Sequence, residues 1–268
     1  MSLRGRYIID RINKSIGHRL KLPCPPYGDP SYWESVYQKL GPSDVFEWGD
    51  LTYGQDLGRH AYNCANVDLS SFGFKQRVDA KGEENEKSFR DTIGLEGSVE
   101  NGKIMLLGCG NSKLGEDMIR SGHFPSHKVV QVDVSQNVIQ SMEKRCADLI
   151  SSGKMDIVLD DAAALTAFSD KSIAATVDKG LVDALYCSRD FETAASVMKS
   201  VHRTLLPRGV FLILSYSQPD FILPKILEQK SSSLWKNVEV RELPSIFMYR
   251  FEKKSPSSHR RGKTCYKT

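Results

Sequence analysis

A glycine-rich turn and an acidic residue further along the chain are the residues whose types and spacing indicate chemistry. The segment Ile104–Met118 reads IMLLGCGNSKLGEDM, an apolar run that ends in Gly-Cys-Gly and leads into helix-forming residues. A second apolar run, VVQVDVS, follows and carries Asp133 near its end. Glycines let a backbone approach a ligand closely, and an acid at the tip of the next strand accepts both hydrogens of a ribose diol. The pattern therefore predicts a nucleotide or nucleoside site.

The spacing of the glycines distinguishes two classes of cofactor. A dinucleotide fingerprint, G-x-G-x-x-G, needs a third glycine, which permits close helix packing beside a pyrophosphate. Lys113 stands at that position, so the sequence disfavours a nicotinamide enzyme. S-adenosylmethionine has no phosphate, and it needs only a glycine-rich turn beside its amino-acid moiety and an acid for its ribose. We therefore expect an S-adenosylmethionine site.

Apolar runs and helix-like segments alternate along the chain, and these elements must position the site. Strands are expected at 104–107, 129–134, 156–159, 173–178 and 210–216, and helices at 114–121, 136–150, 191–205 and 219–228. A terminal hairpin of 236–240 and 246–252 follows. Ser135 suits an N-cap of the second helix and Gly153 suits a stop after it. The alternation predicts a largely parallel sheet with helices on both faces and a ligand beyond the carboxyl ends of the strands.

Two further regions precede the alternating segments. The stretch SYWESVYQKL from residue 31 has helical character and places Trp33 and Tyr37 on one face. The tripeptide FEW, which ends in Trp48, follows it. Core packing is the alternative role for these aromatic side chains. Residues 65–102 are polar and lack a sustained period, which predicts a loop or lid.

One domain with accessory ends accounts for the length and composition. The 268 residues suffice for a full doubly wound core, and 40% hydrophobic with 26% charged residues is ordinary for a soluble globular protein. We expect a basic N-terminal arm over 1–25, a folded domain over 26–254 and a basic flexible tail over 255–268. No apolar run approaches the roughly 18 residues of a membrane span, so we expect no membrane partner.

The net charge of +4 is unevenly distributed. Residues 1–21 carry +5 and residues 250–268 carry +6, which leaves −7 for the residues between them. An acidic body favours a basic substrate segment over nucleic acid, because such fields act on association. Solvated tails on an average domain are the alternative explanation.

Cysteine usage indicates a reducing compartment. The six cysteines lack the CxxC or His/Cys spacing of a metal site, so we expect no metal. Cys109 lies inside the glycine turn, where a disulfide would obstruct a ligand. Reduced thiols predict a cytoplasmic location. The basic segment RGRYIIDRINKSIGHRLK has the character of a mitochondrial presequence apart from Asp10, so mitochondrial import is the alternative. The cysteines are Cys24, Cys64, Cys109, Cys146, Cys187 and Cys265.

A set of motifs gives a more specific indication. The segments YWESVY, FEW, LLGCGNSKLGEDM, QVDVS, VDKGLVDAL and VHRTLLPRGVFLILSYSQP together resemble the eukaryotic protein-lysine methyltransferases that modify translation elongation factor 1A, and their relative that modifies citrate synthase. The resemblance spans residues 31–252. It implies a Rossmann-like, seven-stranded class I methyltransferase sheet, mostly parallel with an antiparallel terminal strand and helices on both faces. It also implies methyl transfer from S-adenosylmethionine to a lysine of elongation factor 1A.

The resemblance further implies which residues hold the cofactor. Aromatic faces of the N-terminal segment would contact the sulfonium, and the acid after the second strand would accept the ribose hydroxyls. A second acidic turn would hold the adenine, and a lysine would pair with the methionyl carboxylate. For that lysine, an exposed position at a strand end is the alternative. These residues are Trp33, Tyr37, Trp48, Gly108, Gly110, Asp133, Val134, Asp161, Ala162 and Lys179.

The sequence departs from the family pattern at three places. Leu106 stands two residues before the first glycine, where class I turns usually carry an acid. The segment between the acid expected at the adenine and Phe168 is one residue longer than in the family pattern. Asp160 is therefore an alternative to Asp161 as that acid. The stretch 49–103 is longer than usual, which leaves family substrate contacts in it undetermined.

The acceptor half of the site is less determined than the cofactor half. Transfer from a sulfonium needs proximity and orientation rather than a metal or a covalent nucleophile. Asp178 and Tyr216 are candidate catalytic groups, with Phe247 and Tyr249 as further wall residues. Structural roles are the alternative for all four. Two other functions stay open: methylation of a small amine or other metabolite, and a non-catalytic interaction module that binds S-adenosylmethionine.

Overall fold

The computed structural model describes residues 25–40, 44–48, 102–227, 234–242 and 246–255 of the chain. The expected loop or lid at 65–102 lies outside these residues, apart from its last position. The expected arm and tail lie outside them as well, apart from Pro25 and Ser255.

A seven-stranded sheet in the order β3-β2-β1-β4-β5-β7-β6 forms the centre of the protein. Strands β1 to β5 pair in parallel, whereas β7 pairs antiparallel with both β5 and β6. This order confirms the mostly parallel sheet with an antiparallel terminal strand. The strands are β1 (Lys103–Leu107), β2 (Lys128–Asp133), β3 (Met155–Leu159), β4 (Ile173–Lys179), β5 (Leu205–Ser215), β6 (Trp235–Glu242) and β7 (Phe247–Lys253).

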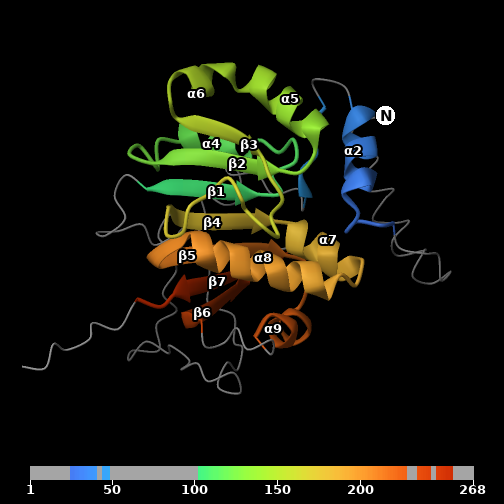
Figure 1. The fold of residues 1–268 in the computed structure, drawn as a ribbon, viewed down its shortest axis with the longest axis vertical. Coiled ribbons are helices and arrows are strands. Elements are labelled where there is room, and N and C mark those ends of the chain that lie inside the picture. The colour runs from blue at the N-terminus through green and yellow to red at the C-terminus, as the bar shows by residue number, and fades with distance from the viewer. Residues whose placement is uncertain (1–24, 41–43, 49–101, 228–233, 243–245, 256–268) are drawn as a thin grey trace, which may run out of the picture.

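Helices cover both faces of the sheet (Figure 1). Helices α4, α5 and α6 lie over one face and α7, α8 and α9 over the other. Their bounds are α4 (Leu114–Arg120), α5 (Gln136–Arg145), α6 (Ala147–Ser151), α7 (Leu181–Cys187), α8 (Phe191–Thr204) and α9 (Pro219–Leu227). A further helix, α2 (Pro30–Gln38), stands at the end toward which the parallel strands point.

The period of the strands explains the two faces. Successive side chains of a strand point to opposite sides of a sheet. Ile104 and Leu106 accordingly pack with Leu114 and Met118 of α4. Met105 and Leu107 instead join the larger core with α7, α8 and α9. Because both faces are buried, the strands read as continuous apolar runs.

The chain order creates a crevice at the carboxyl end of β1. From β1 the chain moves outward to β2 and β3, and it then returns to place β4 on the other side of β1. Such a reversal is where open α/β sheets bind ligands, because the loops on the two sides diverge. The glycine turn that follows β1 lies at this position.

Several element bounds differ from the sequence-based expectation. The helix expected over 136–150 is divided into α5 and α6, because the backbone dihedral angles of Cys146 are not helical (φ −104°, ψ 18°). Strand β5 begins at Leu205 rather than Val210, since Leu205 already pairs with Ile173 before an irregularity in the ladder. Helix α7 was not expected from the pattern. The N-cap at Ser135 is confirmed, because its side chain accepts a hydrogen bond from the backbone N–H of Val138.

Candidate functional site

The glycine turn after β1 depends on backbone conformations that favour glycine. Gly108 and Gly110 have φ of +55° and +51°. A Cβ added to Gly108 would lie 2.9 Å from Cβ of Leu181, at the start of α7. Neither the dihedral nor the space suits a larger residue, because the backbone of the turn lies directly against the start of α7.

Asp133 at the end of β2 lies against this turn. Its Oδ2 accepts a hydrogen bond from the backbone N–H of Gly110 at 2.8 Å, and its Oδ1 accepts one from that of Ser135 at 2.9 Å. Burial raises the pKa of the carboxyl, although these hydrogen bonds oppose the shift. Each carboxylate oxygen has more than one acceptor direction, so a diol can still be bound.

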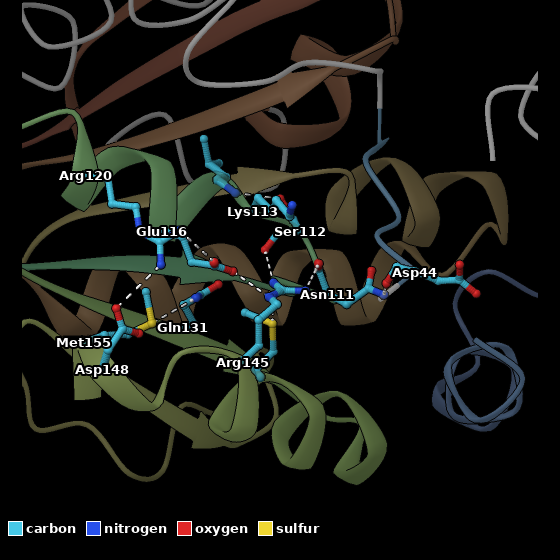
Figure 2. Close-up of polar contacts among 12 residues, drawn as sticks. Asp44, Asn111, Ser112, Lys113, Glu116, Arg120, Gln131, Arg145, Asp148 and Met155 are labelled. Carbon is cyan, nitrogen blue, oxygen red and sulfur yellow. Dashed lines mark hydrogen bonds and ion pairs between the residues drawn. The ribbon is translucent and has the colours of Figure 1, made fainter. Parts of the chain in front are cut away.

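Arg145 of α5 supports the turn from below (Figure 2). Its guanidinium donates to the carbonyl oxygens of Asn111 and Ser112, each at 2.9 Å. Its Nε also pairs with Glu116 at 2.6 Å, and the Glu116 side chain is buried. This planar, multiply hydrogen-bonded group fixes the direction of the carbonyl groups in the turn.

The described residues 25–40 and 44–48, which precede β1, form an aromatic segment. Its rings lie beside the glycine turn as a connected series. Trp33 and Tyr37 stack with centroids 6.0 Å apart, and Phe46 lies between Trp33 and Trp48 at 6.2 and 6.4 Å. None of the residues of α2 is buried. Trp33, Tyr37, Phe46 and Trp48 line a pocket, and Tyr37 also packs against the core cluster beneath α5.

Polar contacts attach this segment to the domain. Asn111 of the glycine turn accepts from the backbone N–H of Phe46 and donates to the carbonyl of Asp44, both at 2.8 Å. Gly28 donates to the hydroxyl of Ser188 at 2.5 Å. These hydrogen bonds add to the packing of Tyr37 against a core cluster and of Trp48 against Tyr216.

One pocket at the carboxyl ends of β1, β2 and β4 is lined by all ten residues that the resemblance implies. They enter it from the aromatic segment, the glycine turn, the ends of β2 and β4, and the turn after β3. Thr193 and Val197 of α8 complete the wall next to Ala162. The lining combines the buried carboxylate of Asp133, apolar side chains and charged groups near the glycine turn, a composition suited to a nucleoside with an amino-acid extension.

The two competing acids after β3 have different surroundings. Asp160 accepts hydrogen bonds from the backbone N–H groups of Asp161 and Ala167 at 2.8 Å, and from the hydroxyl of Thr166 at 3.1 Å. Within the described residues, the carboxylate of Asp161 accepts a hydrogen bond from the backbone N–H of Ala163 through Oδ1 at 2.8 Å. The carboxylate of Asp160 therefore holds the turn with both oxygens, whereas that of Asp161 contacts the turn through Oδ1, and both acids line the pocket.

Lys179 is not an exposed strand-end lysine. Its side chain is 7% exposed, its ammonium pairs with the carboxylate of Glu47, and it donates to the carbonyl of Trp48 at 3.3 Å. The charge of the ammonium is thus neutralised within the protein. Any approach of a second carboxylate to Lys179 takes place beside Glu47.

The candidate acceptor groups lie next to cofactor residues but outside the lining of the pocket. Both oxygens of Asp178 accept backbone N–H groups of Leu181 and Val182, and burial raises the pKa of Asp178 to about 8. Tyr216 contacts Trp48 at 6.2 Å between ring centroids. The hydroxyl of Tyr249 donates to the carbonyl of Ser217 at 2.5 Å. Neither Asp178 nor Tyr216 lines the described pocket, so their catalytic role stays a prediction.

Sequence reasoning did not single out Asp183 of α7. Its carboxylate accepts from the hydroxyl of Ser217 at 3.1 Å, the backbone N–H of Tyr216 at 2.9 Å and the indole N–H of Trp48 at 3.4 Å, and also from the hydroxyl of Ser215. Burial raises the pKa of Asp183, and these donors act against the shift. Asp183 is the second acid of VDKGLVDAL. From the sequence alone it resembles an exposed helix residue, and its burial becomes evident only from the packing of α7.

The family of the chain follows from a comparison with known proteins. The model of the methyltransferase domain family matches residues 98–255, which include every strand of the sheet. The chain belongs to the methyltransferase domain family. This membership supports S-adenosylmethionine as the cofactor, and the strand order is that of the class I, Rossmann-like methyltransferase fold.

Individual relatives of this methyltransferase domain carry more specific names. The eEF1A lysine and N-terminal methyltransferase of Xenopus laevis is 31% identical over 136 residues, which is 50% of this chain and 19% of that protein. The EEF1A lysine methyltransferase 4 of Bos taurus is 27% identical over 73% of this chain and 64% of its own length. A solved SAM-dependent methyltransferase from Methanosarcina mazei is similar over 59% of this chain, with 16% identity and a TM-score of 0.43. The chain thus spans about a fifth of the first relative.

Other classes of site find no support within the part of the chain that the structure describes. Its His, Cys, Asp and Glu side chains form no group suited to a metal ion. The described cysteines, Cys109, Cys146 and Cys187, form no disulfide with one another. In those same residues, no helix has the length and apolar character needed to cross a membrane.

Proposed function

We propose that this chain is a protein-lysine methyltransferase that uses S-adenosylmethionine, with elongation factor 1A as its substrate. The observation that carries the proposal is the single pocket in which the glycine turn, Asp133 and the aromatic segment come together. The names of the relatives support the choice of a lysine of elongation factor 1A.

The residues of the pocket would have separate tasks. Asp133 would bind the ribose, and Asp161 with the backbone of Ala162 would hold the adenine. Lys179 would face the methionyl carboxylate, and the ring of Trp48 would contact the sulfonium. When bound, S-adenosylmethionine supplies an activated methyl group, so the protein needs to orient the partners and exclude water.

The acceptor amine would approach from the side of β5. Trp48 and Tyr216 form an aromatic contact there, and Asp183 holds both the indole N–H of Trp48 and the backbone of Tyr216. An apolar wall favours the neutral form of an amine by desolvation. Neutral lysine is the reactive form, because a protonated amine has no free electron pair.

Mass spectrometry after incubation with S-adenosylmethionine tests the proposal directly. Recombinant elongation factor 1A should gain the mass of one or more methyl groups on a lysine, and the rate should rise with pH. A free lysine amine has a pKa of ~10.4, so each unit of pH below its effective value lowers the reactive fraction about tenfold. The matched control is Asp133→Ala, which should give no product.

Two outcomes would replace the proposal. Efficient methylation of a free amine metabolite, with no product on elongation factor 1A, would establish the small-molecule alternative. Cofactor binding without transfer to any fraction of a cell extract, tested with tritiated S-adenosylmethionine, would establish the interaction module. A cytoplasmic location remains a prediction that imaging of a fluorescent fusion tests.

A further inference from the structure

Glu47, in the aromatic segment, contacts two other parts of the cofactor site. Its Oε1 accepts a hydrogen bond from the backbone N–H of Lys113 at 2.7 Å, and its Oε2 accepts one from the hydroxyl of Ser112 at 2.7 Å. The same Oε2 pairs with the ammonium of Lys179. One carboxylate thus joins the end of the glycine turn, the end of β4 and the aromatic segment.

These contacts are largely shielded from water. The side chains of Lys179 and Glu47 are 7% and 17% exposed, so solvent screens their interaction only weakly. Lys179 and Ser112 line the pocket, whereas Glu47 does not. Glu47 therefore stands behind the pocket wall and acts on a ligand through the groups that it holds.

Glu34 of α2 provides an internal comparison. Its carboxylate accepts from the backbone N–H of Asn137 at 3.3 Å, from the side-chain amide of Asn137 at 2.6 Å, and from the hydroxyl of Ser135. Like Glu47, it attaches the aromatic segment to the N-terminus of a helix beside the site. Unlike Glu47, it forms no ion pair with a side chain of the described residues.

We propose that Glu47 is a positioning residue that fixes the Lys179 ammonium toward the amino-acid end of the cofactor, beyond its part in docking the aromatic segment. The inference rests on the proposed function, because it takes S-adenosylmethionine as the ligand. A lysine has a flexible four-carbon stem, and an ion pair with a charge-assisted hydrogen bond limits its positions. A Lys179 held in this way is oriented before the ligand arrives, so less freedom is lost on binding.

Two ligands separate this role from general docking. S-adenosylhomocysteine carries the amino-acid moiety, whereas 5′-methylthioadenosine carries the nucleoside without it. Their affinities would be measured by competition against S-adenosylmethionine in the unmodified chain and in Glu47→Gln, Glu34→Gln, Lys179→Met and Glu47→Gln/Lys179→Met. Circular dichroism would verify that each variant keeps the fold.

The expected pattern is selective. Glu47→Gln and Lys179→Met should each weaken S-adenosylhomocysteine about tenfold, as for the loss of one charged contact, and 5′-methylthioadenosine by less than about twofold. The double variant should lose no more than Lys179→Met alone. Glu34→Gln should weaken both ligands by the same factor, because it only loosens the segment.

Three results would overturn the inference. Equal losses for the two ligands in Glu47→Gln would assign Glu47 to docking alone. No loss, or losses that simply add in the double variant, would show that Glu47 does not act through Lys179. If the unmodified chain binds neither ligand nor S-adenosylmethionine, the proposed function itself fails, and the inference fails with it.

Discussion

Replacing Gly110 by alanine tests whether α2 and the glycine turn fit together as the structure shows. Gly110 has φ +51°, and an added Cβ would overlap the hydroxyl oxygen of Tyr37, with the ring carbon Cζ at 3.3 Å. A left-handed conformation costs a non-glycine residue about 1–2 kcal/mol. An overpacked contact adds about 1–3 kcal/mol. We therefore expect Gly110→Ala to destabilise the protein by about 2–5 kcal/mol unless α2 moves away.

Gly122→Ala is the matched control. Gly122 has φ +72°, and nothing lies within 4 Å of an added Cβ, so only the conformational cost applies. Tyr37→Phe in the Gly110→Ala background removes the overlapping oxygen. It should recover the part of the destabilisation by which Gly110→Ala exceeds Gly122→Ala. Undocking of α2 removes the overlap with Tyr37, so the additional destabilisation cannot exceed the free energy with which α2 docks.

Urea unfolding measures the total cost in these variants, and amide hydrogen exchange over residues 30–38 reports whether α2 undocks. Faster exchange confined to those amides is expected for Gly110→Ala and not for Gly122→Ala. The reasoning fails if the two alanine variants are equally stable with equal exchange in α2. It fails too if Tyr37→Phe recovers nothing.

Three further predictions concern the cofactor and the stability of the domain. Asp133→Ala should abolish S-adenosylmethionine binding by calorimetry, because it removes the ribose acceptor and the contact to Gly110, and an unchanged affinity would exclude Asp133 from the site. Deletion of residues 1–48 should reduce methyl transfer far more than deletion of 1–24, since only the longer deletion removes the aromatic segment; equal turnover would contradict its role. The raised pKa of Asp178, about 8 against 3.8, means that the folded state holds a proton that the unfolded state has lost between those values, so this group makes stability fall as pH rises from about 4 to about 8. Urea unfolding over that range should show a flatter profile for Asp178→Asn, and an identical profile would refute the assignment.

The sequence was sufficient for the features that depend on local patterns. Each strand of the sheet was expected, because runs such as Ile104–Leu107 are apolar on both faces. The glycine turn and Asp133 were expected in one site, because parallel strands end at the same edge of a sheet. A short helix such as α7 was missed, since its buried Asp183 interrupts the apolar pattern.

Contacts between distant polar residues could not be predicted in the same way. Lys179 and Glu47 are 132 residues apart, and nothing in either local segment identifies the other as its partner. Arg145 likewise reads as an ordinary basic residue near a helix end, which is a favourable place for it whatever else it contacts. Its contacts with the carbonyls of Asn111 and Ser112 depend on how α5 packs below the turn. The sequence predicts residues that line the pocket, while the residues that support them appear only in the folded chain.

The position of β7 between β5 and β6 affects how the domain can form during synthesis. Strand β5 obtains one neighbour, β4, from the chain before it and the other, β7, from the chain after α9. Until β7 has left the ribosome, the second edge of β5 carries unpaired backbone groups and apolar side chains such as Phe211 and Ile213, which are fully buried once the sheet is complete. A nascent chain that already contains the entire glycine turn and Asp133 is therefore still open to edge-to-edge association. Completion of the sheet, rather than completion of the cofactor site, ends that exposure.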